Sequence, residues 1–491
     1  MPVTFRWSTP VCLLVFILVV AAIQLSLTYP LDADTAYHAA VGRLISQHGI
    51  LYSFPWTPYS WFADHYADKE LIFHLLFVPF ALMGISWTTA AQIIGTVAGA
   101  TVLVTMFLIL RAEKVYAPWL WALIPLTASF EFLYRFALVR PFLFSISLAF
   151  VVLWSAVRER LTLLAVVSAL YPWSYVAWHL PVILVAIVET ARWVSVGCLR
   201  WKPMAVSIAG ITTGLLLHPN TLNLIRLTWI EIVGVLFRSS WGKESGFEQG
   251  IELSPTTIDI WTHCLLLTVI MLAIATIIAW RNRKKDVVTL VFVLSALSFG
   301  VLTVKSYKFV EYFVPLSVVA FALAMRHRPW RFLPIIVVLM SVVYTVTLNA
   351  DYIVAMTRRQ DDMPTASAEF LRRTIPKGVL VFSPEWIFTG TLMMALPELR
   401  FVVALNPRYF YEKDPDMYRL WFRLTHEPPP DTANLIRQRF NTRYVLCLNN
   451  EGNRSFMSTL SQTLGVQAFI LENDWVLFDI GGSGSSRSVY E

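Results

Sequence analysis

Two aspartates, Asp32 and Asp34, follow the first apolar stretch of the chain and are separated by a single residue. Pro30 precedes them, and proline ends helices because it lacks a backbone N–H. The pair is therefore expected where an apolar helix gives way to a polar loop. A carboxylate at a water–lipid boundary can serve as a general base toward an acceptor hydroxyl or amine. Two carboxylates can instead share a divalent cation, and an aspartate here can also simply cap the next helix.

The same loop closes on a second charged cluster, Asp64–Glu70 (DHYADKE), directly before the chain turns apolar. Asp64 and Glu70 are candidates to contact a polar acceptor, and Lys69 is a candidate to contact a phosphate. A solvated helix cap is the alternative. Between the two clusters, Thr35–Gln47 has the pattern of an amphipathic helix lying along a membrane surface, with His38 among its polar residues. Five aromatic residues that follow are expected to anchor the loop at the interface or to stack on a sugar: Phe54, Trp56, Tyr59, Trp61 and Phe62.

Several basic and polar residues later in the chain lie next to apolar runs. Charged side chains at membrane depth are costly and by default suggest a site, although snorkelling to the interface is an alternative. The natural partner of these cations is an anionic lipid headgroup, because Arg and Lys bind phosphate well. The candidates for substrate binding in this set are Arg135, Arg140, Lys305, Lys308, His179, His218 and Asn220.

The composition indicates whether these residues are surrounded by water or by lipid. The chain is 57% hydrophobic and 14% charged, with a mean hydropathy of +0.60, whereas soluble domains carry about 25% charged residues. This favours a multi-spanning membrane protein. The net charge of +7 is attributed to Lys and Arg in short loops rather than to nucleic-acid binding. The sequence contains no HExxH, CxxC or GxSxG motif, so a zinc protease, a metal-cluster protein and a serine hydrolase are unsupported.

Long apolar runs predict an α-helical polytopic protein with about 11–12 spans, the first of them a retained signal anchor. A shorter apolar segment, 71–84, either crosses the bilayer or returns at half depth. The predicted spans are 11–28, 88–110, 117–133, 141–157, 162–174, 177–191, 204–218, 260–280, 287–304, 309–325 and 332–349.

Clusters of Lys and Arg orient these spans. The strongest, 192–202, 281–285 and 326–331, are expected in the cytoplasm together with the N-terminus. We expect a bacterial inner-membrane protein whose loops 29–70 and 218–259 and C-terminal domain lie outside. All Lys and Arg clusters lie in the cytoplasm if segment 71–84 returns at half depth and segment 162–191 forms two short helices broken at 173–179. The basic candidates then reach the face that carries the aspartates.

The sequence divides into a transmembrane domain, 1–349, and an extracytoplasmic α/β domain, 350–480, followed by a Gly/Ser-rich tail, 481–491, predicted to be disordered. Short β-type runs bounded by turn residues alternate with helical segments in the second domain. The predicted strands are 379–383, 401–404, 444–448, 468–471 and 475–480, and the predicted helices are 365–375, 387–395, 414–425, 431–439 and 455–464.

In outline the chain resembles the GT-C superfamily of polytopic membrane glycosyltransferases, which have an acidic motif early in a large first outer loop. The similarity rests on Asp32–His38 (DADTAYH) with Gly42-Arg43, Trp61–Leu71, Val139–Pro141 (VRP) and Trp178-His179. The segment from Val379 to Leu448 is similar to the outer domain of uncharacterised bacterial members.

This resemblance implies a polyprenyl-phosphate sugar donor, transfer at the outer face and an aspartate in the first loop as base. Asp34 best matches that base, with Asp32 beside it. Some members carry a metal-binding acid in the second outer loop, whereas Tyr134–Pro141 has none. We therefore expect no metal ligand set, while a divalent cation at the aspartates stays open.

The predicted function is inverting transfer of a hexosyl or pentosyl unit from a polyprenyl-phosphate donor to a glycan, lipid or protein acceptor, with no nucleic acid involved. Asp34 would act as base, and Lys305 and Arg140 would hold the phosphate. The alternatives are a transporter or flippase of a lipid-linked or envelope component, and a non-catalytic envelope-assembly protein. Many spans and intramembrane charge also fit a transporter.

Overall fold

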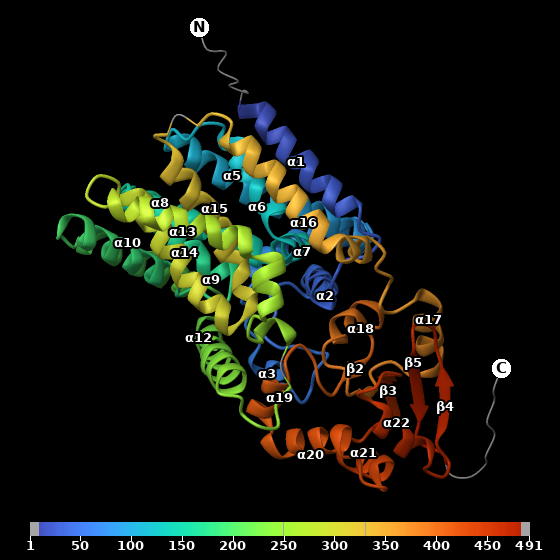
Figure 1. Cartoon of the computed structure of the whole chain (residues 1–491). Helices are drawn as coiled ribbons and strands as arrows, with labels where there is room; N and C mark the ends of the chain where they lie inside the picture. Colours follow the sequence, from blue (N-terminus) through green and yellow to red (C-terminus); the bar gives the residue numbers. More distant parts are fainter. Residues whose placement is uncertain (1–8, 249, 329, 483–491) are drawn as a thin grey trace. The chain divides into compact units, whose positions relative to one another are not determined.

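The computed structural model of the protein describes residues 9–248, 250–328 and 330–482 (Figure 1). Most of the predicted tail, 483–491, lies outside this part of the chain. The contacts divide the chain into two compact units. We call them the helical unit, built from Met1–Leu31, Lys69–Thr221 and Ile251–Arg359, and the mixed unit, built from Asp32–Asp68, Leu222–Gly250 and Gln360–Glu491.

The helical unit follows the predicted apolar runs closely. Its helices are α1 (Thr9–Leu25), α4 (Leu71–Leu82), α5 (Trp87–Ala112), α6 (Pro118–Ala128), α7 (Phe130–Ala137), α8 (Phe142–Val157), α9 (Leu161–Ser174), α10 (Leu180–Val196), α11 (Trp201–Leu217), α13 (Leu266–Arg281), α14 (Val287–Lys305), α15 (Val310–Met325) and α16 (Leu333–Thr357), with short turns η2 (Ile251–Leu253), η3 (Ile260–Cys264) and η4 (Tyr307–Phe309).

Four of these helices, α5, α14, α15 and α16, are long and apolar enough to cross a membrane. The number rises to six if the bent pairs α7–α8 and α11–α12 (α12, Thr221–Trp229, continued by η1, Ile230–Trp241) each count as one span. Further apolar helices of 10–17 residues include α1, α4 and α9. At 1.5 Å per residue, α4 is about 18 Å long, shorter than the roughly 30 Å of a hydrocarbon core. The predicted break within 162–191 is confirmed, because α9 ends at Ser174 and α10 begins at Leu180.

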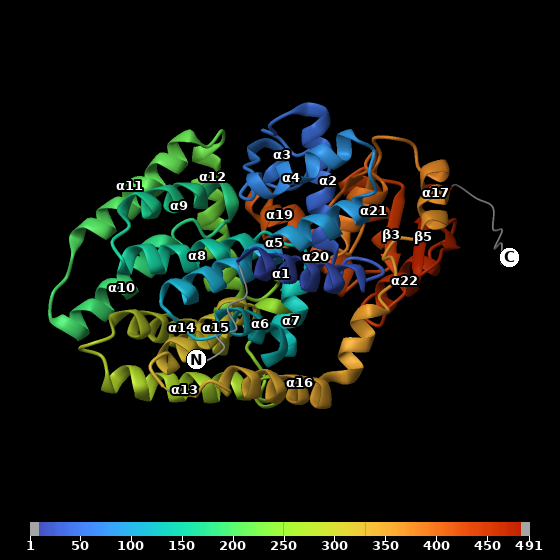
Figure 2. The same cartoon turned by 90° about the horizontal axis from the view of Figure 1, so that it is seen from above.

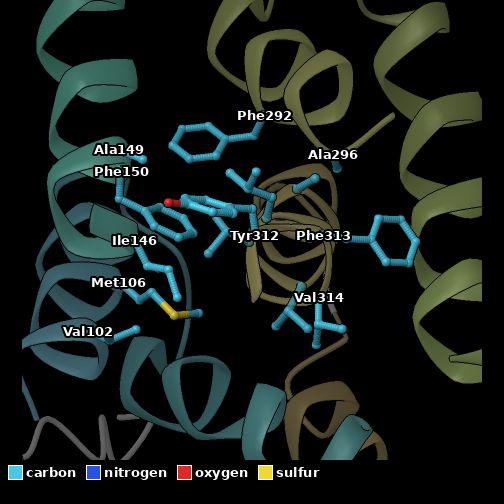
Figure 3. Packing of buried hydrophobic residues seen from close by; sticks show 14 of the residues in the cluster. Val102, Met106, Ile146, Ala149, Phe150, Phe292, Ala296, Tyr312, Phe313 and Val314 are labelled. Carbon is cyan, nitrogen blue, oxygen red and sulfur yellow. The ribbon is translucent and has the colours of Figure 1, made fainter. Parts of the chain in front are cut away.

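The centre of the helical unit is α15, which is apolar on every side and 83% buried over its membrane-length window, as expected of a helix enclosed by others. Figure 3 shows Tyr312 of α15 close to Phe150 of α8 and Phe292 of α14. The Phe150 and Phe292 rings stack at 5.8 Å between centroids, and the Tyr312 hydroxyl bonds Ser145 Oγ at 2.7 Å. Because lipid is as apolar as these side chains, close packing rather than water exclusion holds the helices together.

Small residues allow helices α9 and α11 to approach each other closely. Gly210 and Gly214 form a GxxxG stripe on α11. A Cβ at Gly214 would come within 2.1 Å of the Ala169 carbonyl oxygen, and one at Gly210 within 2.5 Å of the Ala165 oxygen. Only glycine fits such backbone contact, which is how GxxxG stripes bring membrane helices together. The two helices lie side by side in Figure 2.

The mixed unit is a five-stranded sheet with helices. Its strand order is β2-β1-β3-β5-β4, with β1 parallel to β2 and β3, and β5 antiparallel to β3 and β4. The five predicted strands and five predicted helices of this region are present with small shifts in their ends, and α19 was not predicted. The elements are α2 (Ala33–His48), α3 (Phe62–His65), α17 (Thr365–Thr374), β1 (Leu380–Phe382), α18 (Thr389–Ala395), β2 (Arg400–Phe401), α19 (Pro407–Lys413), α20 (Pro415–His426), α21 (Thr432–Phe440), β3 (Tyr444–Leu448), α22 (Arg454–Ser461), β4 (Gln467–Ile470) and β5 (Trp475–Asp479).

The aromatic residues of the first loop are part of this unit, so the prediction that they anchor the loop at the membrane interface is wrong for most of them. Phe54, Trp56, Trp61 and Phe62 are each at most 3% exposed. Trp56 Nε1 donates to the Pro397 carbonyl at 2.8 Å, and the backbone N–H of Trp61 donates to Tyr409 at 2.8 Å. These side chains fill a protein core instead of facing lipid.

The predicted amphipathic helix forms as α2, but it uses its small residues for packing within the unit. It lies against α18, where a Cβ at Gly390 would come within 2.3 Å of the Ala33 carbonyl oxygen. Arg43 adds a hydrogen bond from Nη2 to the Met394 carbonyl at 3.2 Å. The expectation of a helix lying along the membrane surface is not met.

The boundary predicted at residue 349 also differs from the structure. Helix α16 runs on to Thr357, with a non-helical residue at Asn349 marking the predicted end. The loop segments 32–68 and 222–250, assigned from sequence to the transmembrane domain, belong to the mixed unit. The sequence did not indicate that these loops belong to the mixed unit, because the loops and the strands they pack with are separated by hundreds of residues.

Candidate functional site

Basic side chains meet in the helical unit at a sharp bend. Helix α7 begins where Ser129 caps the backbone N–H of Phe132 at 3.3 Å, and it ends before Pro141. The chain bends by 113° between helices α7 and α8. Arg135 lies in the last turn of α7 and Arg140 in the connection between the helices. The bend thus brings two guanidinium groups, five residues apart, to the same acidic side chain.

That side chain is Glu252 of the short turn η2. Arg135 Nη2 donates to Glu252 Oε2 at 3.1 Å, and Arg140 Nη1 donates to the same oxygen at 3.0 Å. Lys308 Nζ lies 3.8 Å from Oε1. Three cations therefore surround one carboxylate. We call Arg135, Arg140, Lys308 and Glu252 the basic cluster.

A second carboxylate supports the cluster from inside the bundle. Glu311, at the start of α15, is 1% exposed and accepts from Arg135 Nε at 2.6 Å. Arg135 is itself only 2% exposed. Removing one partner of such a buried pair costs about 3–5 kcal/mol, because the other charge is left without compensation. Glu311 thus fixes the position of Arg135.

The backbone fastens Glu252 in place. Ser306 Oγ donates to the Leu253 carbonyl at 3.0 Å, and the Tyr307 N–H donates to the Ser254 carbonyl at 3.1 Å. Segment 251–256 is thereby attached to the turn between α14 and α15, which also carries Lys308. The carboxylate and the cations are held by two adjoining pieces of backbone.

The electrostatics favour an anion at this position. Burial alone would raise the pKa of the Glu252 carboxyl, but Arg135, Arg140 and Lys308 hold that pKa below its ordinary value. Three positive groups face two carboxylates, those of Glu252 and Glu311. The arrangement can bind an oxyanion through charge-assisted hydrogen bonds, which phosphate oxygens accept as carboxylates do.

Other predicted residues of the helical unit lie at the ends of helices. Lys305, the last residue of α14, is exposed, and its side chain makes no ion pair with another described residue. The His218 ring accepts from the Asn220 N–H at 3.1 Å and packs edge-on against Trp173. His179 stands at the start of α10. Lys69 and Glu70 directly precede α4.

The predicted acids and histidine of the first loop belong to the mixed unit. Asp32 caps α2, accepting at one oxygen from the Thr35 N–H at 3.2 Å and from the Thr35 hydroxyl at 2.5 Å. Asp34 is in the first turn of the same helix, and His38 follows one turn later. Asp64 pairs with Lys413 Nζ at 2.6 Å, and this hydrogen bond lowers its pKa.

Sequence reasoning missed Glu311. It falls in an apolar run, 309–325, and was read as part of a span. The available signal was its spacing: an acid three residues after Lys308 and at membrane depth requires a partner. The sequence did not indicate that Glu252 is the common partner of three cations.

Comparison with known proteins places the fold. No family model matches the chain, and no curated protein matches it in sequence. Solved structures do match. The archaeal oligosaccharyltransferase AglB from Archaeoglobus fulgidus, solved with an inhibitory peptide and a dolichol-phosphate, superposes with a TM-score of 0.63 and 11% identity, over 98% of this chain and 75% of AglB. ArnT from Cupriavidus metallidurans gives 0.60 and 12%, over 96% and 97% of the two chains.

The arabinofuranosyltransferase AftD from Mycobacteria gives a TM-score of 0.55 and 13% identity, over 97% of this chain and 40% of AftD. The chain thus spans less than half of that protein. These matches show that the chain has the fold of AglB, ArnT and AftD, the fold that the GT-C resemblance predicted. The resemblance drawn from the sequence motifs is confirmed at the level of the fold.

Proposed function

We propose that this chain is a glycosyltransferase that moves a sugar from a polyprenyl-phosphate donor to an acceptor at the outer face of the membrane. The observation that carries the proposal is the basic cluster, in which three cations converge on one carboxylate inside a GT-C fold. Arg and Lys in this arrangement suit a phosphate group. The similar AglB structure was solved with a dolichol-phosphate, and we extend that kind of ligand to this chain.

In the proposed step an acceptor oxygen or nitrogen attacks the anomeric carbon of the donor sugar. The bond from that carbon to the phosphate oxygen breaks, and its electron pair stays on the departing polyprenyl phosphate. Arg135, Arg140 and Lys308 stabilise the charge that develops there, most effectively where water is excluded. Attack from the face opposite the phosphate inverts the anomeric configuration. The acceptor is a glycan, a lipid or a protein.

Asp34 is the proposed base that takes the acceptor proton. Asp32 is the weaker choice, since one of its oxygens is already engaged by the Thr35 N–H and hydroxyl. Lys305 is proposed only as a peripheral contact for the phosphate, because it stands outside the basic cluster. We propose that the step needs no metal ion.

The test separates binding from transfer. Native mass spectrometry of the purified protein with undecaprenyl monophosphate should show one bound lipid. Arg140→Gln should lose this lipid, whereas Asp34→Asn should retain it. The control is Lys202→Gln, on the exposed start of α11, which should also retain it. Asp34→Asn, blocked in transfer, should copurify with the glycosylated lipid, whereas the unaltered protein releases it as monophosphate. Lipid binding that survives Arg140→Gln would refute the phosphate site, and full transfer by Asp34→Asn would refute the base.

A further inference from the structure

A cavity of about 250 Å³ lies in the helical unit between two interhelical connections, α5–α6 and α15–α16. Its lining combines aromatic, apolar and basic side chains, among them Tyr116, Trp121, Met325, Arg328, Arg331 and Leu333. The cavity stands at the C-terminal end of α15, whereas the basic cluster stands at the N-terminal end. A helix of this length separates them by about 24 Å, so the cavity is distinct from the proposed transfer site.

The basic residues of the cavity differ in how far they are neutralised. Arg326 is already paired, through Nη1 with Glu113 at 3.1 Å and through Nη2 with Asp286 at 2.9 Å. Glu113 is buried and also pairs with Arg158. The side chains of Arg328 and Arg331 are exposed and form no hydrogen bond or ion pair with any described residue. Two guanidinium groups at the cavity are therefore available to an anion.

The apolar part of the cavity indicates what kind of anion. Trp121, 2% exposed, packs edge-on against Phe321 at 5.7 Å and forms a buried apolar surface, with Met325 and Leu333 nearby. Trp330 and Phe332 in the same connection are 60% and 74% exposed. Aromatic residues at the ends of spans typically settle at the lipid headgroup level. A free phosphate ion would use the guanidinium groups but leave the apolar wall without a partner.

We propose that this cavity binds the headgroup of an anionic phospholipid, with its phosphate on Arg328 and Arg331 and its glycerol and first acyl carbons against Trp121, Met325 and Leu333. Basic pockets at the ends of membrane helices recognise anionic headgroups in this way. The bound lipid would join the α5–α6 connection to the α15–α16 connection. This role is independent of the sugar transfer.

The test is lipid binding by the full chain in detergent, followed by native mass spectrometry. Phosphatidylglycerol should occupy one tight site, while phosphatidylcholine and inorganic phosphate bind at least tenfold more weakly. Arg328→Gln/Arg331→Gln should weaken phosphatidylglycerol at least tenfold. The matched control, Lys284→Gln/Lys285→Gln, removes two charges from the exposed α13–α14 connection and should leave the affinity unchanged.

Several outcomes would overturn the proposal: equal affinity of both double variants, equal binding of phosphatidylcholine, or displacement of the lipid by millimolar inorganic phosphate, which would indicate a simple anion site. Folding is checked by the thermal transition in phosphatidylcholine, which the Gln substitutions should not change because neither Arg side chain forms a hydrogen bond or ion pair with a described residue. Arg328→Lys/Arg331→Lys keeps the charge but not the bidentate geometry, and it should restore part of the affinity.

Discussion

Arg140 donates to Glu252 Oε2 at 3.0 Å, in the position a phosphate oxygen would occupy in the proposed transfer reaction. Glu252 and an incoming phosphate would then compete for the same cations. Glu252 is held by the backbone contacts of its own segment, and its side chain is 27% exposed. Its carboxylate is the common partner of the three cations.

The first prediction concerns this competition. Glu252→Gln should raise the affinity for undecaprenyl monophosphate about tenfold, equivalent to about 1.4 kcal/mol, because the competing charge is removed while the cations stay. Binding by native mass spectrometry measures it. Glu244→Gln is the control, as Glu244 pairs with Arg408 of the mixed unit. A lower affinity in Glu252→Gln would mean that Glu252 organises the site and does not compete for it.

The second prediction concerns the buried pair of Arg135 and Glu311. Arg135→Met should lower the free energy of unfolding by about 3–5 kcal/mol, because Glu311 is left charged and buried. Arg135→Met/Glu311→Leu should recover much of this loss, since neither charge remains. Denaturant-induced unfolding in detergent compares the variants. The pair would not be a structural unit if the double variant were less stable than the single one.

The third prediction addresses the contact of α9 with α11. Gly214→Leu should destabilise the protein by at least about 1–3 kcal/mol, because the new side chain meets the Ala169 carbonyl and overpacking strains a close-packed interface. Thr213→Leu adds bulk at the exposed neighbouring position and should change little. The thermal transition of each purified variant provides the measurement, and equal effects of the two substitutions would contradict the role of the stripe.

The fourth prediction is a pH dependence in the mixed unit. His426 Nε2 lies 2.9 Å from Glu248 Oε1, and this hydrogen bond raises the histidine pKa above its usual 6.5. A raised pKa stabilises the folded state fully below the unfolded-state pKa, and the effect is lost as pH rises through the folded-state value. Thermal stability should therefore fall as pH rises from about 6.5, and His426→Gln should reduce that slope. An unchanged slope would show that other groups govern it.

The fifth prediction concerns metal dependence. Transfer should persist after exhaustive chelation with EDTA, and added Mg²⁺ or Mn²⁺ should not raise the rate, because the proposed mechanism stabilises the leaving phosphate with protein cations. The assay follows loss of the glycosylated lipid that is recovered from Asp34→Asn and added to the unaltered protein. A rate that collapses on chelation and returns with one added cation would require a metal at the aspartates.

The sequence predicted the helices and strands well because their signals are local. The break between Ser174 and Leu180 and the strand Tyr444–Leu448 follow from apolar runs and the polar residues that interrupt them. The residues that a buried side chain packs against, in contrast, are often far from it in the sequence. Trp56 bonds Pro397, 341 residues away, and nothing near Trp56 distinguishes this core position from an aromatic membrane anchor.

The residues of the candidate site likewise divide into those that the sequence indicated and those that it did not. The unusual placement of Arg135, Arg140 and Lys308 was visible as charge next to apolar runs, and the structure joins them. Their acidic partners were not visible, because pairing depends on the bend before α8 and on the turn between α14 and α15. Lys305 belongs to the same short motif as Lys308 and lies three positions before it. Its side chain is exposed and stands outside the basic cluster.

The mixed unit has a consequence for how the protein is made. It is built from three stretches of chain, and the first of them, 32–68, is synthesised nearly 300 residues before the last, 360–491, begins. Domains usually fold as they emerge from the ribosome, N-terminal parts first. Here the partners of Trp56 and Trp61 are Pro397 and Tyr409, so the early loop must remain incompletely folded, with its aromatic residues unprotected, until those later residues have been synthesised. A C-terminal fragment starting at residue 350 would lack part of its own core.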